Sequence, residues 1–158
     1  MGYALQSLLR IRAMREDRAA GEMTAARQVV IAAQETLEAR RRDLSQYEAT
    51  REERRDRIFN AVIGHAVTRD QLDLAKEGVA RIDEEGILKA DNVRQAEADL
   101  RKSEEAEAAA RERYNLATKN RMKIDEHRAA WQIGQLKEEE ARAEGELEDF
   151  TVRKTDDD

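Results

Sequence analysis

Few side chains in this sequence have the types and spacing that catalysis or metal binding requires. The chain has no cysteine, and its two histidines, His65 and His127, lie too far apart in sequence for a usual zinc site. Asp125, Glu126 and His127 are consecutive, so on a helix their side chains point in different directions. No His-x-x-x-His pair and no glycine-rich phosphate loop is present. We therefore expect no metal, no cofactor and no enzymatic activity.

Two clusters of arginine have the charge that a nucleic-acid interface would need. A run at Arg40–Arg42 is followed by four more arginines between residues 51 and 57. Acidic residues are interleaved with them, and the whole chain has a net charge of −6. Binding to a phosphate backbone needs unopposed positive charge. We therefore interpret these clusters as solvated helix faces with ion pairs between residues four apart, and expect no nucleic-acid partner.

The composition is typical of long helices. Ala, Glu, Lys, Leu and Arg supply 89 of the 158 residues, proline is absent, and Leu, Ile, Val and Phe together number only 29. Such a chain cannot build a β-sandwich, a doubly wound α/β domain, a disulfide scaffold or a membrane-spanning protein. Disorder is the rival class, but the charges are mixed in sign and the large apolar residues are periodic.

The first sixty residues carry a seven-residue repeat. A repeat of this period places its members on one seam that a partner helix can cover. Glu16, Arg51 and Arg54 weaken the seam. The first row is Leu9, Glu16, Met23, Val30, Leu37, Leu44, Arg51 and Ile58, and the companion row is Arg12, Ala19, Ala26, Ala33, Arg40, Tyr47, Arg54 and Ala61.

The strongest turn signal lies between residues 64 and 68. Gly64 interrupts the repeat, and Thr68 with Gln71 has the spacing of a helix-capping box. This pattern predicts a single helical hairpin, with a first arm over about 3–63, a turn over 64–68, a second arm over about 69–150 and an acidic tail over 151–158. Gly78 and Gly86 leave open that the turn extends further.

The second arm has a similar pair of rows. Each arm has only one apolar stripe, so the two should pack together as a long antiparallel two-helix coiled coil of the all-α class, and we expect a monomer. Folding about the turn places Leu5 opposite Arg128 and leaves the residues after Gly134 overhanging. The rows are Leu72, Val79, Gly86, Val93, Leu100, Glu107, Tyr114 and Arg121, and Ala75, Ile82, Lys89, Ala96, Ser103, Ala110, Ala117, Ile124 and Trp131.

Large apolar residues crowd the predicted turn in a chain that is otherwise poor in them. They admit two interpretations: a small core that seals the turn, or a knob that docks on a partner. The residues are Ile58, Phe59, Val62, Ile63, Val67, Leu72, Leu74, Val79 and Ile82.

Four strings of the sequence carry a family resemblance. They are LLRIRAMREDRA from Leu8, YEATREERRDRIF from Tyr47, KIDEHRAAW from Lys123 and EEEARAEGELEDF from Glu138. In this order they resemble the YscO-like proteins of bacterial type III secretion systems, whose flagellar counterpart is FliJ. The first string together with the final ELEDF is the most telling combination.

The resemblance implies a mechanical role. Members of this family look like the coiled-coil part of the rotary ATPase γ subunit and act as a central stalk between the hexameric secretion ATPase and the export gate. Some also bind the chaperones of secreted translocators. A cytoplasmic location, peripheral at the inner-membrane face of the secretion apparatus, is implied as well.

The resemblance also suggests which residues contact partners. A γ-like stalk enters its hexamer with the end that carries both termini, which implies ATPase contacts for Leu8, Arg10, Arg12, Arg15, Trp131 and Phe150. The turn end would then suit the export gate or a chaperone groove through Phe59, Val62, Ile63 and Leu74.

Two other function classes remain open from the sequence. One is a generic structural coiled coil, such as a parallel homodimer that acts as a tether. The other is an adaptor that escorts chaperones without forming a stalk. The break between Gly64 and Gln71 disfavours the parallel dimer, which would prefer an uninterrupted repeat.

Overall fold

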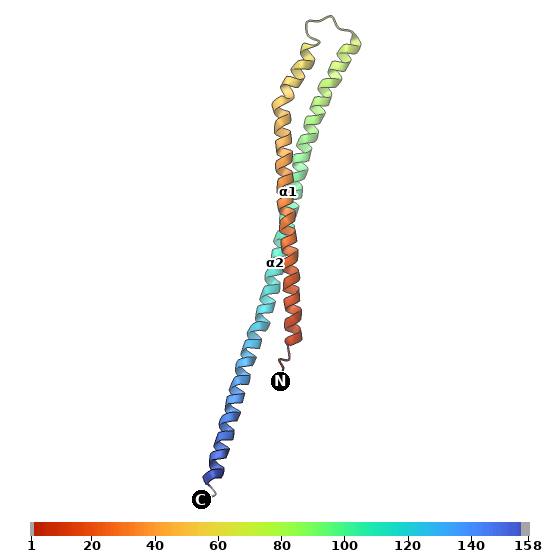
Figure 1. Ribbon diagram of the computed structural model, residues 1–158. Coiled ribbons are helices and arrows are strands. Elements are labelled where there is room, and N and C mark those ends of the chain that lie inside the picture. The colour runs from red at the N-terminus through yellow and green to blue at the C-terminus, as the bar shows by residue number, and fades with distance from the viewer. Residues whose placement is uncertain (1, 156–158) are drawn as a thin grey trace. The chain divides into compact units, whose positions relative to one another are not determined.

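The computed structural model describes the backbone of residues 2–155 and the side chains of residues 2–147. Two long helices make up most of this chain: α1 spans Gln6–Asn60 and α2 spans Arg69–Thr155 (Figure 1). No strand occurs between residues 2 and 155. The helices pack against each other in opposite directions, which confirms the predicted all-α helical hairpin.

The helix bounds differ from those predicted. α1 begins at Gln6 and ends at Asn60, inside the expected 3–63 at both ends. α2 continues to Thr155, so helix replaces most of the expected tail, and residues 156–158 lie outside the described part of the chain. α2 also runs unbroken through Gly78 and Gly86, so the turn does not extend into that region.

The connection between the helices uses local hydrogen bonds at both of its ends. After α1, the Ile63 amide donates to the Phe59 carbonyl at 2.8 Å, and Gly64 then takes a φ of 79° that reverses the chain. Before α2, the Gln71 amide donates to Thr68 Oγ1 at 3.3 Å, and the Thr68 amide donates to Gln71 Oε1 at 2.9 Å. The predicted capping box is therefore formed in both directions.

The chain divides into two compact units, and both helices contribute to each. The terminal unit comprises Met1–Met23 and Ala110–Asp158, and the turn unit comprises Thr24–Ala109. In the terminal unit Leu9, Ala19 and Ala110 are buried. In the turn unit the buried residues are Val30, Leu37, Tyr47, Ile82, Ala96 and Ser103.

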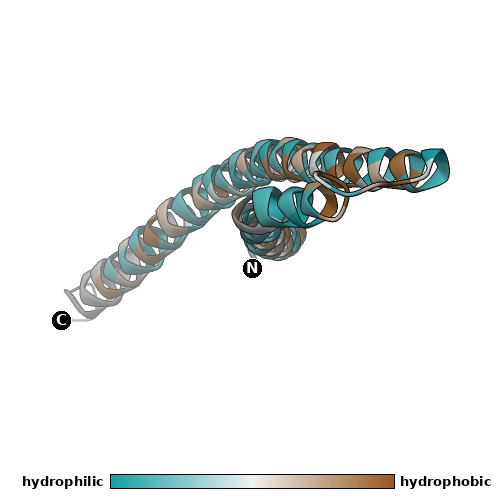
Figure 2. Cartoon of the chain, turned by 90° about the horizontal axis from the view of Figure 1, so that it is seen from above, coloured by the Kyte–Doolittle hydropathy of each residue, from teal (hydrophilic) through white to brown (hydrophobic). Residues whose placement is uncertain are grey.

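The buried positions coincide with the predicted rows of the seven-residue repeat. Of the sixteen positions in the two rows of the first arm, only Arg40 and Ala61 are exposed. On α2 the exposed members are Leu72 and Arg121, which are the first and the last residue of one row. Figure 2 shows the recurrence along the helices as brown, apolar bands separated by teal, hydrophilic ones. One narrow seam is therefore the shared core of each unit.

Ion pairs and ring contacts fix the antiparallel pairing within each unit. In the terminal unit Tyr3 lies against Trp131, with ring centroids 5.4 Å apart, which agrees with the expected neighbourhood of Arg128. In the turn unit Arg41 pairs with Glu97 at 2.9 Å and Arg54 pairs with Glu85 at 2.8 Å. Partner numbers on α2 fall as those on α1 rise, as antiparallel helices require.

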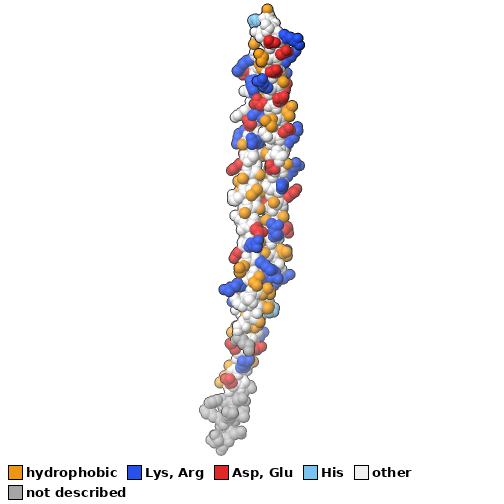
Figure 3. Space-filling model, turned by 90° about the vertical axis from the view of Figure 1, so that its right-hand side faces the viewer, with side chains coloured by type: hydrophobic (Ala, Val, Ile, Leu, Met, Phe, Trp, Pro, Cys, Tyr) orange, Lys and Arg blue, Asp and Glu red, His pale blue; other side chains and the backbone are white. Residues whose placement is uncertain are grey.

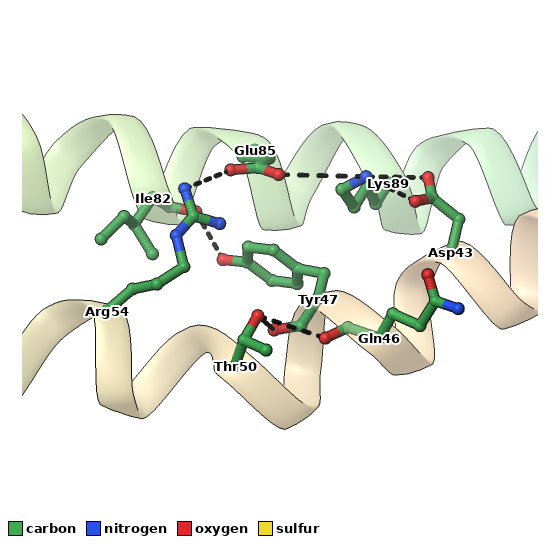
Figure 4. A network of polar contacts seen from close by, with 8 residues as sticks. All are labelled: Asp43, Gln46, Tyr47, Thr50, Arg54, Ile82, Glu85 and Lys89. Atoms are coloured by element: carbon green, nitrogen blue, oxygen red, sulfur yellow. Dashed lines mark hydrogen bonds and ion pairs between the residues drawn. The ribbon is translucent and has the colours of Figure 1, made fainter.

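A polar network crosses the seam of the turn unit (Figure 4). Lys89 occupies a seam position on α2, and its Nζ lies 2.8 Å from both carboxylate oxygens of Asp43. The same ammonium group lies 3.9 Å from Glu85, which also binds Arg54. The Tyr47 hydroxyl donates to the carbonyl of Ile82. These contacts pair the charge of Lys89 and satisfy the Tyr47 hydroxyl, the polar groups that this part of the seam contains.

Candidate interaction surfaces

Apolar residues of the turn unit line two cavities near the helix connection. One has a volume of 330 Å³ and is lined by Phe59, Val62, Ile63, Leu72, Ala75, Lys76 and Val79. Leu74 lines the other, of 620 Å³, and Val62 and Ala75 line both. The structure therefore brings Phe59, Val62 and Ile63 together and places Leu74 at the neighbouring cavity.

The apolar residues near the turn divide into a group that is buried between the helices and a group that is exposed. Ile82 is buried and Ile58 is half-buried, with its Cδ1 3.0 Å from the position that a Cβ on Gly78 would take. Ile63 and Leu74 are 67% and 64% exposed, so the pair of helices does not cover them. A set that the sequence presents as one cluster thus contains a closed part and an open part.

An aromatic cluster lies in the terminal unit near the start of α1. The Tyr3 hydroxyl is hydrogen-bonded to Nδ1 of His127 at 2.8 Å, and Trp131 lies on the next turn of α2. Leu8 and Trp131, two of the residues predicted to contact a partner, are half-buried. The sequence pattern did not single out Tyr3, because it precedes the first helix and belongs to no row of the repeat.

The three arginines predicted to contact the ATPase line two different hollows of the terminal unit. Arg12 and Arg15 line a cleft of 190 Å³ with Arg113, Leu116, Ala117 and Asn120. Arg10 lines a different cavity, with Tyr3, Ala4, Gln6 and Ser7. Within the described part of the chain none of these three predicted arginines makes an ion pair. The sequence pattern did not indicate Arg113 and Asn120, because both lie off the repeat.

Glu16 is the acidic residue that interrupts the seam of α1, and it is fully used inside the terminal unit. Its carboxylate accepts hydrogen bonds from Arg121 and from the Thr118 hydroxyl, the latter at 3.0 Å. The hydrogen bond from Arg121 is the main reason that the pKa of Glu16 lies below its ordinary value of 4.5. Desolvation opposes this shift, and the Thr118 bond adds to it. Glu16 is therefore not available to neutralise Arg12.

The sequence is most acidic after Trp131. Residues 132–158 contain ten acidic and four basic residues, a net charge of −6 that equals the charge of the whole chain. All described side chains in 136–147 are exposed, and Ile133 and Leu136 are 56% and 59% exposed. The predicted contact residue Phe150 lies outside the described side chains. Elsewhere the two signs are interspersed, as the face in Figure 3 shows.

The residues 2–147 contain no group of three or more His, Cys, Asp or Glu side chains placed to hold a metal ion. A search of the described helices for an apolar segment of membrane-spanning length finds none. The features that remain as candidate sites are the cavities of the turn unit, the arginine cleft of the terminal unit and the acidic end of α2.

Comparison with known proteins gives one family and one solved structure. The family described as type III secretion protein YscO matches residues 5–153. The fold is similar to the structure of CT670 from Chlamydia trachomatis, which is described as a YscO homolog, with a TM-score of 0.74 and 19% sequence identity. That similarity covers 95% of this chain and 92% of the other, and it shows the fold. No curated protein matches the sequence.

Proposed function

We propose a mechanical role for this chain, which belongs to the YscO family of type III secretion proteins. Membership makes it a protein of type III secretion; the proposal concerns the part it plays there. It is a non-catalytic central stalk that connects the hexameric secretion ATPase to the export gate. Its place is cytoplasmic and peripheral, at the inner-membrane face of the apparatus.

The observation that carries the proposal is the different chemistry of the two units. In the terminal unit Arg10, Arg12 and Arg15 make no ion pair with any side chain that the structure describes. The turn unit instead exposes Ile63 and Leu74 beside apolar cavities. A linker between two partners needs two unlike contact surfaces, and α1 begins in one of these units and ends in the other. The terminal unit is assigned to the ATPase and the turn unit to the gate.

A pull-down of the cognate ATPase by two variants tests this assignment. Reversing Arg10, Arg12 and Arg15 to Glu should weaken capture of the ATPase and preserve the helix content measured by circular dichroism, because none of the three makes an ion pair within residues 2–147. Changing Phe59 and Ile63 to Ser should leave ATPase capture intact and weaken capture of the export-gate protein. Capture of the ATPase by the arginine variant at the wild-type level would show that the assignment is wrong.

The cavities of the turn unit favour one further partner class. A groove lined almost wholly by apolar side chains suits the apolar face of a partner helix, and translocator chaperones are the candidates that the family suggests. A chain that escorts chaperones without binding the ATPase would capture the chaperone through Phe59 and Ile63 only. A generic tether built as a parallel dimer is disfavoured by the antiparallel pairing of α1 with α2.

A further inference from the structure

The arginine cleft of the terminal unit combines positive charge with apolar surface. Its lining residues come from both helices: Arg12 and Arg15 from α1, and Arg113, Leu116, Ala117 and Asn120 from α2. Three arginines and one asparagine therefore line the same 190 Å³. Leu116, which is 60% exposed, adds an apolar patch beside these donors.

Of the three arginines of this cleft, only Arg113 pairs with an acidic residue in the described part of the chain. Glu16, one helical turn after Arg12, is bound by Arg121 and Thr118. Glu22 pairs with Arg18 at 3.1 Å and also with Arg113 at 3.7 Å. Arg12 and Arg15 make no ion pair within the described part of the chain. The cleft thus keeps a positive charge that the fold does not balance.

Arg12 is poorly explained by the fold itself. It occupies a seam position that leucine or alanine would fill without polar atoms, and it is half-buried there. Its Nε is buried and has no hydrogen-bond partner. Nε of Arg51 is buried in the same way, but Arg51 pairs with Asp83 at 3.1 Å through another nitrogen, whereas Arg12 makes no ion pair in the described part of the chain. Each such buried donor without an acceptor lowers the stability of the fold. A residue that costs stability in a narrow seam is better explained by a contact made outside the chain.

We propose that this cleft binds a glutamate or aspartate carboxylate of an acidic helical segment in a partner protein. A planar guanidinium group matches a carboxylate through paired hydrogen bonds, and Arg12 and Arg15 make no ion pair within the described residues that would compete for it. Asn120, which also lines the cleft, has an amide that is a further donor. An apolar side chain beside the carboxylate covers Leu116, which an inorganic anion would leave exposed. The inference deepens the proposed function by naming the chemistry of the partner surface that meets the terminal unit.

The test uses the full chain and two synthetic helical peptides in a fluorescence anisotropy titration. One labelled peptide carries Glu beside Leu on one face, and its matched control carries Gln in place of each Glu. The Glu peptide should bind and the Gln peptide should not, and binding should weaken as salt rises. Arg12→Gln combined with Arg15→Gln should weaken binding about tenfold or more, because two charge-assisted contacts are lost.

Two control variants distinguish binding at the cleft from general electrostatic attraction and from an effect on folding. Arg27→Gln combined with Arg40→Gln removes the same charge from exposed positions in the turn unit and should leave binding unchanged. Arg12→Leu should weaken peptide binding while raising the melting temperature of the chain, because it fills the seam. A lower melting temperature for this variant would show that the fold requires Arg12 and would overturn the inference.

Three other results would also overturn it. They are wild-type affinity in the Arg12 and Arg15 variant, an equal loss in the turn-unit control, and binding of inorganic phosphate at the cleft without binding of the Glu peptide. The peptide titration involves no ATPase, so the cleft and the stalk role can fail separately. If the chain binds the peptide but captures no ATPase, the proposed carboxylate site is supported and the proposed stalk function is contradicted.

Discussion

Tyr47 and Gly86 show how single residues set the approach of the two helices in the turn unit. A Cβ placed on Gly86 would lie 2.6 Å from the Tyr47 hydroxyl oxygen and 2.8 Å from its Cε1. The hydroxyl lies there because it donates to the carbonyl of Ile82, one turn earlier on α2. Only glycine leaves room for this ring, although glycine weakens a helix interior.

Gly86→Ala should therefore destabilise the chain by roughly 1–3 kcal/mol, as overpacking of a closed contact does, despite the better helix propensity of alanine. The matched control is Gly134→Ala, where nothing lies within 4 Å and the same change should stabilise. Urea unfolding followed by circular dichroism measures both. A stabilising Gly86→Ala would mean that Tyr47 does not occupy this position.

Glu16 predicts a specific dependence on pH. Its pKa in the folded chain is held below the ordinary 4.5, chiefly by the hydrogen bond from Arg121. The carboxylate therefore contributes stability above pH 4.5, and this contribution is lost as the pH falls through the lowered value. Glu16→Gln should flatten the fall of stability below that pH. The control Asp17→Asn, at an exposed neighbour, should keep the wild-type slope in urea unfolding at stepped pH.

Residue-level contacts were only partly predictable from the sequence. The seven-residue rows identified Leu9, Leu37 and Ile82 as core, because their period alone decides which face is covered. The partner of the Tyr47 hydroxyl and the need for Gly86 depend on the axial alignment of two helices, which the repeat leaves undetermined. The sequence therefore leaves open that the turn extends to Gly86, whereas this residue lies within α2 and accommodates the Tyr47 ring.

At the scale of the helix, the seam is narrow and contains polar members. Lys89 and Ser103 occupy seam positions, and the Ser103 hydroxyl donates to the Leu100 carbonyl at 2.7 Å within α2. Lys89 is satisfied only by Asp43 and Glu85, so a shifted alignment would leave its charge unpaired. Such residues lower the stability of incorrect alignments more than they raise that of the correct one.

Leu37→Asp should destabilise the hairpin by several kcal/mol, a large share of the roughly 5–15 kcal/mol of an ordinary domain. Leu37 is 6% exposed, so the carboxylate would replace an apolar side chain in the only seam of the turn unit. Val29→Asp, on the same helix but 58% exposed, is the matched control and should cost little. Thermal melts monitored by circular dichroism compare the two, and equal melts would show that the seam is misassigned.

The helix ends were predicted where local chemistry sets them. Thr68 with Gln71 fixes the start of α2, and both expected hydrogen bonds of the capping box are formed. The end of α2 carries no comparable stop signal, since neither proline nor glycine follows Leu147. The acidic composition there indicated a tail, yet composition alone does not end a helix.

At the scale of the molecule, we expect a monomer in solution. Each apolar seam is covered by the other helix of the same chain, and the excess of acidic residues in 132–158 opposes contact between two copies of that segment. Light scattering at several concentrations should give the mass of one chain, 18.1 kDa. A mass of two chains that persists on dilution would contradict both this expectation and the proposed stalk.

The position of Trp131 makes one half of the molecule optically distinct. It is the single tryptophan of the chain, and it lies beside Tyr3 in the terminal unit. Indole emission therefore reports on the terminal unit alone, whereas far-ultraviolet ellipticity sums the helices of both units. Superimposable unfolding curves from the two signals would mean one cooperative transition, and separated curves would give the order in which the units melt without any label.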